Sequence, residues 1–127
     1  MAERYPALRR AAERRGRRAE FVAALLLMAK GYHILGRRVR THAGEIDLVA
    51  RSPGGLLCFV EVKTRGSMRD AQESLLPRQR ARIARAAELY LAQRRGLSSC
   101  GVRFDTIMIS DRNWPVHRRD AWRPEAR

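Results

Sequence analysis

Apolar and polar positions repeat with two periods along the chain, and these periods predict its elements. Residues 17–29 show helical spacing and end before Gly31, which predicts a helix whose core-facing residues are Phe21, Val22, Leu25, Leu26 and Met28. Residues 78–95 form the longest helical pattern, with an apolar face made of Ile83, Ala86, Ala87, Tyr90 and Leu91.

Four segments with apolar alternation predict strands. Three of them, residues 32–40, 45–51 and 56–64, follow one another across the turns HAG and SPGG, which predicts a meander of hairpins. The fourth, VRFDTIMIS at residues 102–110, follows the longer helix. The order helix, three strands, helix, strand predicts a mixed α/β domain.

The ends of the chain do not read as further domains. Residues 1–16 are arginine-rich and are interpreted as a basic amino-terminal extension, residues 17–110 as the folded domain, and residues 111–127 as an irregular tail. The apolar run 21–29 follows arginines as in an export signal, but Glu20 and Lys30 flank it and it is too short to span a membrane. Cys58 and Cys100 have no CxxC spacing. We therefore expect a cytoplasmic protein without a membrane partner.

The charge balance narrows the class of partner. The chain has 27 Lys and Arg residues against 13 Asp and Glu residues, a net charge of +14. Such an excess is typical of proteins that bind a polyanion, and nucleic acid, above all DNA, is the leading partner. A compositional bias toward arginine would also make the surface basic, so charge alone does not identify the partner.

The stretch FVEVKTR, residues 59–65, places charged residues in what otherwise reads as a buried strand. Because strand side chains alternate with period two, Glu61 and Lys63 share one face of that strand. In GEIDLVA the same parity groups Glu45 with Asp47 and places Ile46 and Leu48 on the opposite face. If the two strands pair as a hairpin, Asp47 and Glu61 come close together.

Two neighbouring carboxylates repel each other, and Lys63 compensates only one of them. A divalent cation such as Mg²⁺ or Mn²⁺ would complete the set, since Mg²⁺ binds one or two carboxylates together with waters and phosphate oxygens. A lysine beside it would orient or help deprotonate an attacking water, which suits phosphodiester hydrolysis. The alternative is structural: Glu61 and Lys63 form a salt bridge at a strand end, and Asp47 is a turn residue.

The segment GYHILGRRVRTHAGEIDLVARSPGGLLCFVEVKTR, with the later VRFDTIMIS, resembles the YraN family of bacterial proteins over about residues 16–110. That family is related to Holliday-junction resolvases and restriction endonucleases. The resemblance implies a restriction-endonuclease-like, PD-(D/E)XK core: a central mixed sheet flanked by helices. Asp47 and Glu61 match its metal ligands, Lys63 its catalytic lysine, and Glu20 the acid on the first helix of resolvase-like members. Where relatives commonly carry asparagine, near residue 38, this chain has Arg38.

The sequence therefore predicts a nucleic-acid-binding, magnesium-dependent endonuclease that hydrolyses phosphodiester bonds in DNA. The expected metal ligands are Asp47, Glu61, Glu20 and the carbonyl of Val62, with Glu45 a weaker candidate. The expected phosphate contacts are Arg65, Arg78, Arg82 and Arg85. Alternative functions are a non-catalytic nucleic-acid-binding protein with the same fold and a structural partner of a larger assembly. The sequence leaves a homodimer open.

Overall fold

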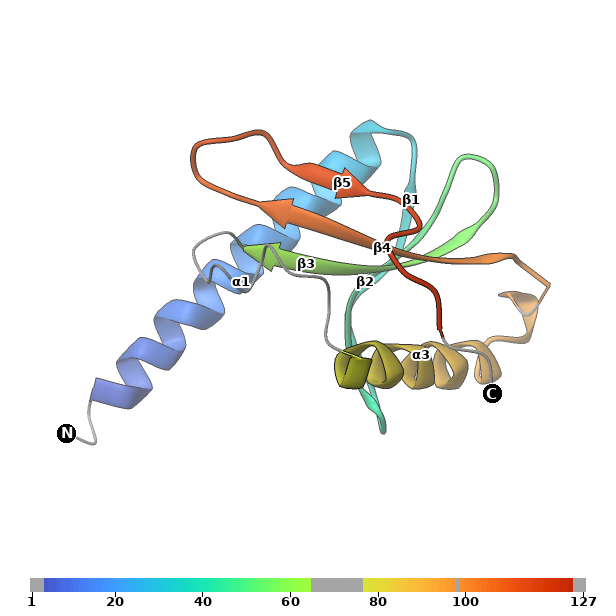
Figure 1. Cartoon of the computed structure of the whole chain (residues 1–127), viewed down its shortest axis with the longest axis horizontal. Helices are drawn as coiled ribbons and strands as arrows, with labels where there is room; N and C mark the ends of the chain where they lie inside the picture. Colours follow the sequence, from blue (N-terminus) through green and yellow to red (C-terminus); the bar gives the residue numbers. More distant parts are fainter. Residues whose placement is uncertain (1–3, 65–76, 98, 125–127) are drawn as a thin grey trace.

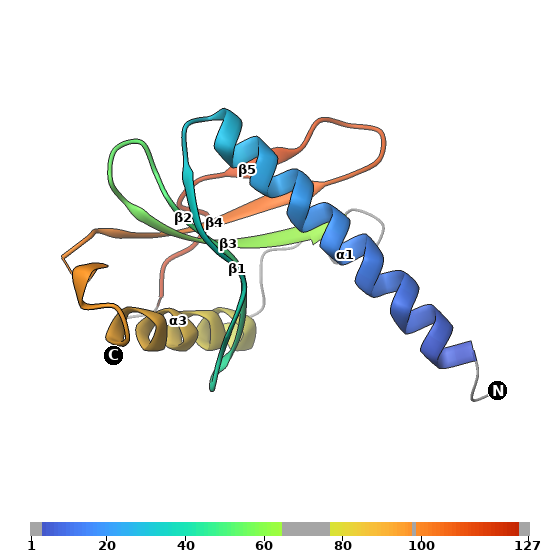
Figure 2. The ribbon, with the colours of Figure 1, turned by 180° about the vertical axis from the view of Figure 1, so that it is seen from behind.

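The computed structural model describes residues 4–64, 77–97 and 99–124, in which a five-stranded sheet packs between two helices (Figure 1, Figure 2). The elements in chain order are α1 (Arg4–Ala29), β1 (His33–Thr41), β2 (Gly44–Arg51), β3 (Leu57–Thr64), α3 (Pro77–Ala92), the short 3-10 helix η2 (Arg95–Leu97), β4 (Val102–Ile109) and β5 (Val116–Arg118).

The strands lie in the sheet in their sequence order. β1, β2 and β3 form the predicted antiparallel meander. β3 and β4 are parallel, which requires a crossover, and α3 lies within that connection. β5 returns antiparallel to β4 at the sheet edge. The predicted mixed α/β class is confirmed.

Each face of the sheet has its own apolar cluster. The cluster under α3 includes Phe59, stacked on Phe104 with ring centroids 5.7 Å apart, and the helix residues Ile83, Ala86, Ala87 and Tyr90. These four are buried and Leu91 packs against the cluster, so the predicted face of this helix is confirmed. The cluster under α1 joins Leu48, Ala50, Cys58, Val60 and Ile107 to that helix.

The predicted inner face of α1 is wrong for its largest side chains. Phe21, Leu25 and Met28 are exposed, and the helix instead buries Ala19, Glu20, Ala23, Ala24 and Leu27. Small alanine side chains let the helix axis approach the sheet closely, so the bulky residues fall outside the contact. The helix also begins at Arg4, so residues 4–16 of the predicted extension continue α1.

Helix α1 ends where the sequence predicts. Gly31 has φ of 89°, the left-handed conformation in which glycine commonly terminates helices. Tyr32 N–H then donates to the Leu27 carbonyl at 2.9 Å, and β1 follows directly. Among the described residues, none of the helices has the length and apolar character that crossing a membrane requires.

The carboxy-terminal residues are more ordered than the sequence predicts. Instead of an irregular tail, residues 111–124 include β5 and the buried Trp122. Trp122 packs against Phe104 with ring centroids 4.4 Å apart, and Ala121 N–H donates to the Phe104 carbonyl at 2.8 Å. Three residues of strand and one large aromatic side chain suffice to fix this segment, although its prolines and polar residues resemble a loop.

Candidate active site

The candidate site lies where β2 and β3 separate. Their pairing runs from Arg51 opposite Leu57 to Leu48 opposite Val60. The next pair in this register is Asp47 and Glu61, just beyond the last paired residues. In Figure 1 and Figure 2 the beginning of β2 turns toward α3, whereas the end of β3 runs toward α1. The two acids therefore stand at a fork in the sheet.

Asp47 and Glu61 are in direct contact, as the strand alternation predicts. Their carboxyl groups are joined by a hydrogen bond. The Oδ2 atom of Asp47 also accepts a hydrogen bond from Val62 N–H at 2.8 Å. The backbone of β3 thus holds one oxygen of Asp47 in place and directs this carboxylate to Glu61.

Electrostatics at the fork favour the protonated form of Glu61. Burial raises the pKa of Glu61, and the charge of Asp47 and their hydrogen bond raise it further, to about 9 despite the opposing influence of Lys63. The Glu61 carboxyl is therefore protonated at neutral pH and donates to Asp47. A raised pKa is the usual result when one carboxyl is forced close to another.

Glu20 on α1 approaches the same acids from the helix side. Burial raises its pKa, the charge of Asp47 adds to this, and Arg38 opposes it. Glu20 Oε1 lies 2.9 Å from Arg38 Nε, without the alignment of a hydrogen bond between these atoms. The third acid is thus engaged by a neighbouring guanidinium.

Arg38 lies on β1 across from the point where the side-chain alternation of β2 changes. The β1–β2 register places Arg38 opposite Asp47, and its φ of 51° is in the left-handed region, which asparagine tolerates better than arginine. Beside it, Ile46 packs in the α3 cluster but Leu48 packs in the α1 cluster. The prediction that Ile46 and Leu48 share a face is therefore wrong, because β2 twists at Asp47.

The comparison with known proteins now identifies the family. The model of the uncharacterised protein family UPF0102 matches residues 19–109. The protein belongs to the UPF0102 family. This is the YraN family of the sequence analysis, so that resemblance is confirmed.

Relatives of this UPF0102 protein match nearly the whole chain. A UPF0102 protein of Maricaulis maris is 51% identical over 116 residues, 91% of each chain. One from Paramagnetospirillum magneticum is 52% identical over 117 residues, 89% of this chain and 90% of its own. One from Mesorhizobium japonicum is 46% identical over 122 residues, 96% of this chain and 97% of its own. These names state family and no activity, so function rests on the site.

Asp47 and Glu61 of this UPF0102 protein fit part of the ligand set of a hard divalent cation. In the described ranges, no cluster of three or more acids, histidines or cysteines is arranged to hold a metal. Asp47 and Glu61 supply carboxylate oxygens, and Mg²⁺ commonly takes one or two carboxylates with water and phosphate oxygens. A cation held by these two carboxyl groups would take the place of the proton on Glu61. The ligand roles of Glu20 and of the Val62 carbonyl stay predictions.

The remaining predicted residues lie around the fork at different distances. Lys63 is partly buried two residues beyond Glu61, and its influence on that acid shows that it is near. Glu45 is exposed, with its Oε2 3.4 Å from Arg40 Nε. On α3, Arg78, Arg82 and Arg85 are exposed. Arg65 lies outside the described residues, and the four phosphate contacts stay predictions.

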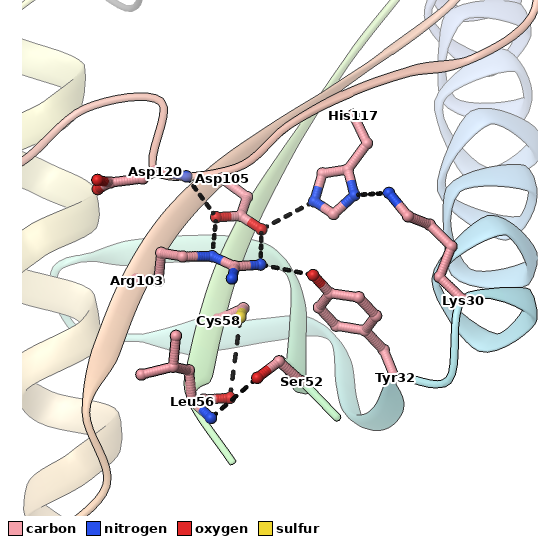
Figure 3. A network of polar contacts seen from close by, with 9 residues as sticks. All are labelled: Lys30, Tyr32, Ser52, Leu56, Cys58, Arg103, Asp105, His117 and Asp120. Carbon is pink, nitrogen blue, oxygen red and sulfur yellow. Dashed lines mark hydrogen bonds and ion pairs between the residues drawn. The ribbon is translucent and has the colours of Figure 1, made fainter. Parts of the chain in front are cut away.

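A second polar group, not anticipated from the sequence, is centred on the fully buried Asp105 of β4 (Figure 3). Arg103 donates from Nε to Oδ1 and from Nη2 to Oδ2 of Asp105, each at 2.8 Å. His117 Nε2 lies 2.8 Å from Oδ2, and Asp120 N–H donates to Oδ1 at 3.0 Å. The signal was present in RFD, because strand alternation puts Arg103 and Asp105 on one face.

Proposed function

We propose that this UPF0102 protein is a metal-dependent endonuclease that hydrolyses phosphodiester bonds in DNA, with Mg²⁺ or Mn²⁺ as cofactor. The observation that carries the proposal is the hydrogen-bonded pair Asp47 and Glu61, held at the strand fork beside Lys63. A protein that only binds nucleic acid gains nothing from this arrangement, because acids repel phosphate. An acid such as Glu61, whose pKa is raised by burial and by a neighbouring carboxylate, is typical of a functional site.

The cation would stabilise, as a Lewis acid, the negative charge that develops on the phosphate during hydrolysis. Asp47 and Glu61 would hold it, and Glu61 would give up its proton on binding. Val62 N–H keeps the Asp47 carboxylate oriented, so the site does not reorganise when the substrate arrives. Burial of Glu61 limits water around the pair.

Lys63 follows Glu61 on the same strand face by parity and would act on the attacking water. Its amine can orient the water and, when deprotonated, accept a proton from it. The water oxygen then bonds to phosphorus, one P–O ester bond breaks, and the leaving oxygen takes up a proton from solvent. The products are a phosphomonoester and a hydroxyl at the cut.

The basic surface supports nucleic acid as substrate. The net charge of +14 attracts the phosphate backbone, and Arg78, Arg82 and Arg85 expose their side chains on α3. Gly44, at the beginning of β2, lies against the side chain of Arg82: a Cβ there would be 2.9 Å from Arg82 Cδ. Arg82 is therefore close to the hairpin that carries Asp47.

One observation favours a second candidate, a non-catalytic nucleic-acid-binding protein. Arg38 neutralises Glu20, which leaves two acids at the fork. Such a protein would bind DNA through its arginines and use the Asp47–Glu61 pair only as a structural contact.

A cleavage assay separates the two candidates. Linear, nicked, flapped and four-way DNA are incubated with the protein in Mg²⁺, in Mn²⁺ or in EDTA. We expect cutting of at least one substrate with a divalent cation and none in EDTA. Asp47→Asn should abolish the cutting while affinity stays equal or rises, because a negative charge near the phosphates is lost. If the protein binds the substrates but cuts none of them in either metal, the nuclease proposal is contradicted and the second candidate is favoured.

A further inference from the structure

The segment between β4 and β5 displays a large aromatic side chain among arginines. Trp114 is 89% exposed, whereas the chain's other tryptophan, Trp122, is 6% exposed in the core. Val116 is exposed as well. The exposed basic residues of this segment are Arg112, Arg118 and Arg119. Asp111 is the one acid among residues 110–119. Single exposed apolar residues are common on protein surfaces, but exposed apolar residues grouped within a polar rim mark interaction sites, and Trp114 and Val116 are two positions apart among arginines.

This basic-aromatic segment, residues 111–119, is fixed from below by the Asp105 network (Figure 3). The side chain of His117 is only 2% exposed and reaches Asp105 from β5. Since strand side chains alternate, the inward direction of His117 turns Val116 and Arg118 outward. The exposed residues therefore stand on a strand whose orientation is set by a buried contact.

The same histidine also ties the segment to α1. Its Nε2 hydrogen points to Asp105, so Nδ1 accepts a hydrogen bond from Lys30 Nζ at 2.6 Å. The Tyr32 ring meets the imidazole edge-on with centroids 5.7 Å apart, and Tyr32 OH accepts from Arg103 Nη2 at 2.6 Å. These contacts restrain the segment before any ligand binds, which lowers the entropy cost of binding.

The segment also lies at the edge of the sheet that carries the candidate active site. In the parallel β3–β4 register, Lys63 is opposite Met108 and Thr64 is opposite Ile109. The chain beyond Ile109 therefore leaves the sheet beside the end of β3. Figure 1 and Figure 2 both show the β4–β5 loop at this end of the molecule, near α1.

We infer that Trp114 is a stacking platform for an unpaired nucleobase, and that Arg112, Arg118 and Arg119 contact the phosphates next to that base. The inference rests on the proposed function in that it names the substrate class: nucleic acid with a single-stranded segment. Stacking on an exposed aromatic ring beside basic residues is how proteins hold unpaired bases. A second copy of this chain is a poorer occupant, because its charge of +14 would repel this surface.

The test measures binding in EDTA, where no cutting interferes. A labelled single-stranded oligothymidylate and a blunt duplex of equal length are titrated by fluorescence anisotropy with the parent, Trp114→Ala and Trp114→Phe. We expect Trp114→Ala to weaken single-strand binding by about tenfold or more, and Trp114→Phe to retain most of it. Duplex affinity should change by less than about twofold. Arg112→Ala should weaken both ligands alike and reduce the slope of log affinity against log salt by about 1.

A direct spectroscopic signal comes from the variant Trp122→Phe, in which Trp114 is the one remaining tryptophan. Saturable quenching of its emission by the oligothymidylate is expected. The anisotropy measurement needs no Trp122 substitution, so it stands even if that variant folds poorly.

Unchanged single-strand affinity in Trp114→Ala would overturn the inference, and so would an equal loss of affinity for duplex and single strand. The inference would also be overturned if Trp114→Ala lost self-association or binding to anionic vesicles while its DNA binding stayed the same. Failure of the proposed function looks different. A protein that binds single strands through Trp114 but never cuts DNA contradicts the nuclease proposal alone. One that cuts DNA regardless of Trp114 contradicts this inference alone.

Discussion

Glu61 is an acid whose charged form is destabilised by folding. Burial and the neighbouring Asp47 raise its pKa from 4.5 to about 9. A pKa that is higher in the folded state means that folding favours the protonated acid. Its contribution to stability is therefore complete below pH 4.5 and is lost as the pH rises through about 9. This follows for the metal-free protein, since a bound cation would favour the ionised acid instead.

The substitution Glu61→Gln keeps the size of the side chain and removes its charge. In EDTA we expect the variant to match the parent near pH 5 and to exceed its free energy of unfolding by more than about 1.4 kcal/mol near pH 9, because each unit by which folding raises a pKa is worth about that much stability. Urea unfolding at pH 5, 7 and 9 measures this difference. The matched control is Glu45→Gln, an exposed acid on the same hairpin. A difference in the free energy of unfolding that does not grow with pH would contradict the raised pKa of Glu61.

At the scale of elements, β5 depends on one buried ion pair. Burial alone would raise the pKa of Asp105, but hydrogen bonds from His117, Arg103 and Asp120 N–H outweigh it and lower the pKa to about 2. Because the folded pKa is the lower one, this stabilisation is present above 3.8, the ordinary value, and is lost as the pH falls toward 2. Acid should therefore loosen β5 and the basic-aromatic segment.

The variant Asp105→Asn tests this anchor. Removing one partner leaves the partly buried Arg103 guanidinium without its counter-charge, and breaking a buried pair in this way typically costs up to about 3–5 kcal/mol. Thermal and urea unfolding at pH 7 should show this loss, and at pH 2.5 the gap to the parent should narrow. Asp120→Asn, an exposed acid of the same segment, should change stability by less than about 0.5 kcal/mol. Similar losses in both variants would contradict a specific role for Asp105.

The elements differ in how far the sequence predicts them. The strands of the meander and α3 were predictable because their apolar residues repeat with a clean period and bury large side chains. The face of α1 was not, because close packing through alanines reverses the expectation that large apolar residues point inward. The closeness of Asp47 and Glu61 followed from the hairpin pairing of β2 and β3, whereas the break in alternation at Asp47 and the left-handed conformation of Arg38 are not revealed by any spacing. The order of residues 111–124 depends on tertiary contacts of His117 and Trp122.

The whole molecule combines a net positive charge, which attracts polyanions, with a group of acids at the strand fork, which repels them. The 27 basic residues outnumber the 13 acidic residues, and the resulting positive charge attracts polyanions. The acids Glu20, Asp47 and Glu61 nevertheless influence one another at one site. The β4–β5 segment leaves the sheet beside the end of β3, the strand that carries Glu61. A nucleic acid held by arginines and by Trp114 would thus lie beside the acids, which is the arrangement that a nuclease requires.

The most direct test of this account is the effect of Lys63→Arg on cleavage and on binding, measured on one DNA substrate. Arginine keeps the positive charge but is effectively always protonated, so it cannot accept a proton from water. If Lys63 acts on the attacking water, the variant should keep an affinity within about twofold of the parent and cleave at a rate lower by ~100-fold or more, the loss usual for a positioned proton-transfer group. An unchanged cleavage rate in Lys63→Arg would contradict the account, because Lys63 would then be only an electrostatic partner of Glu61.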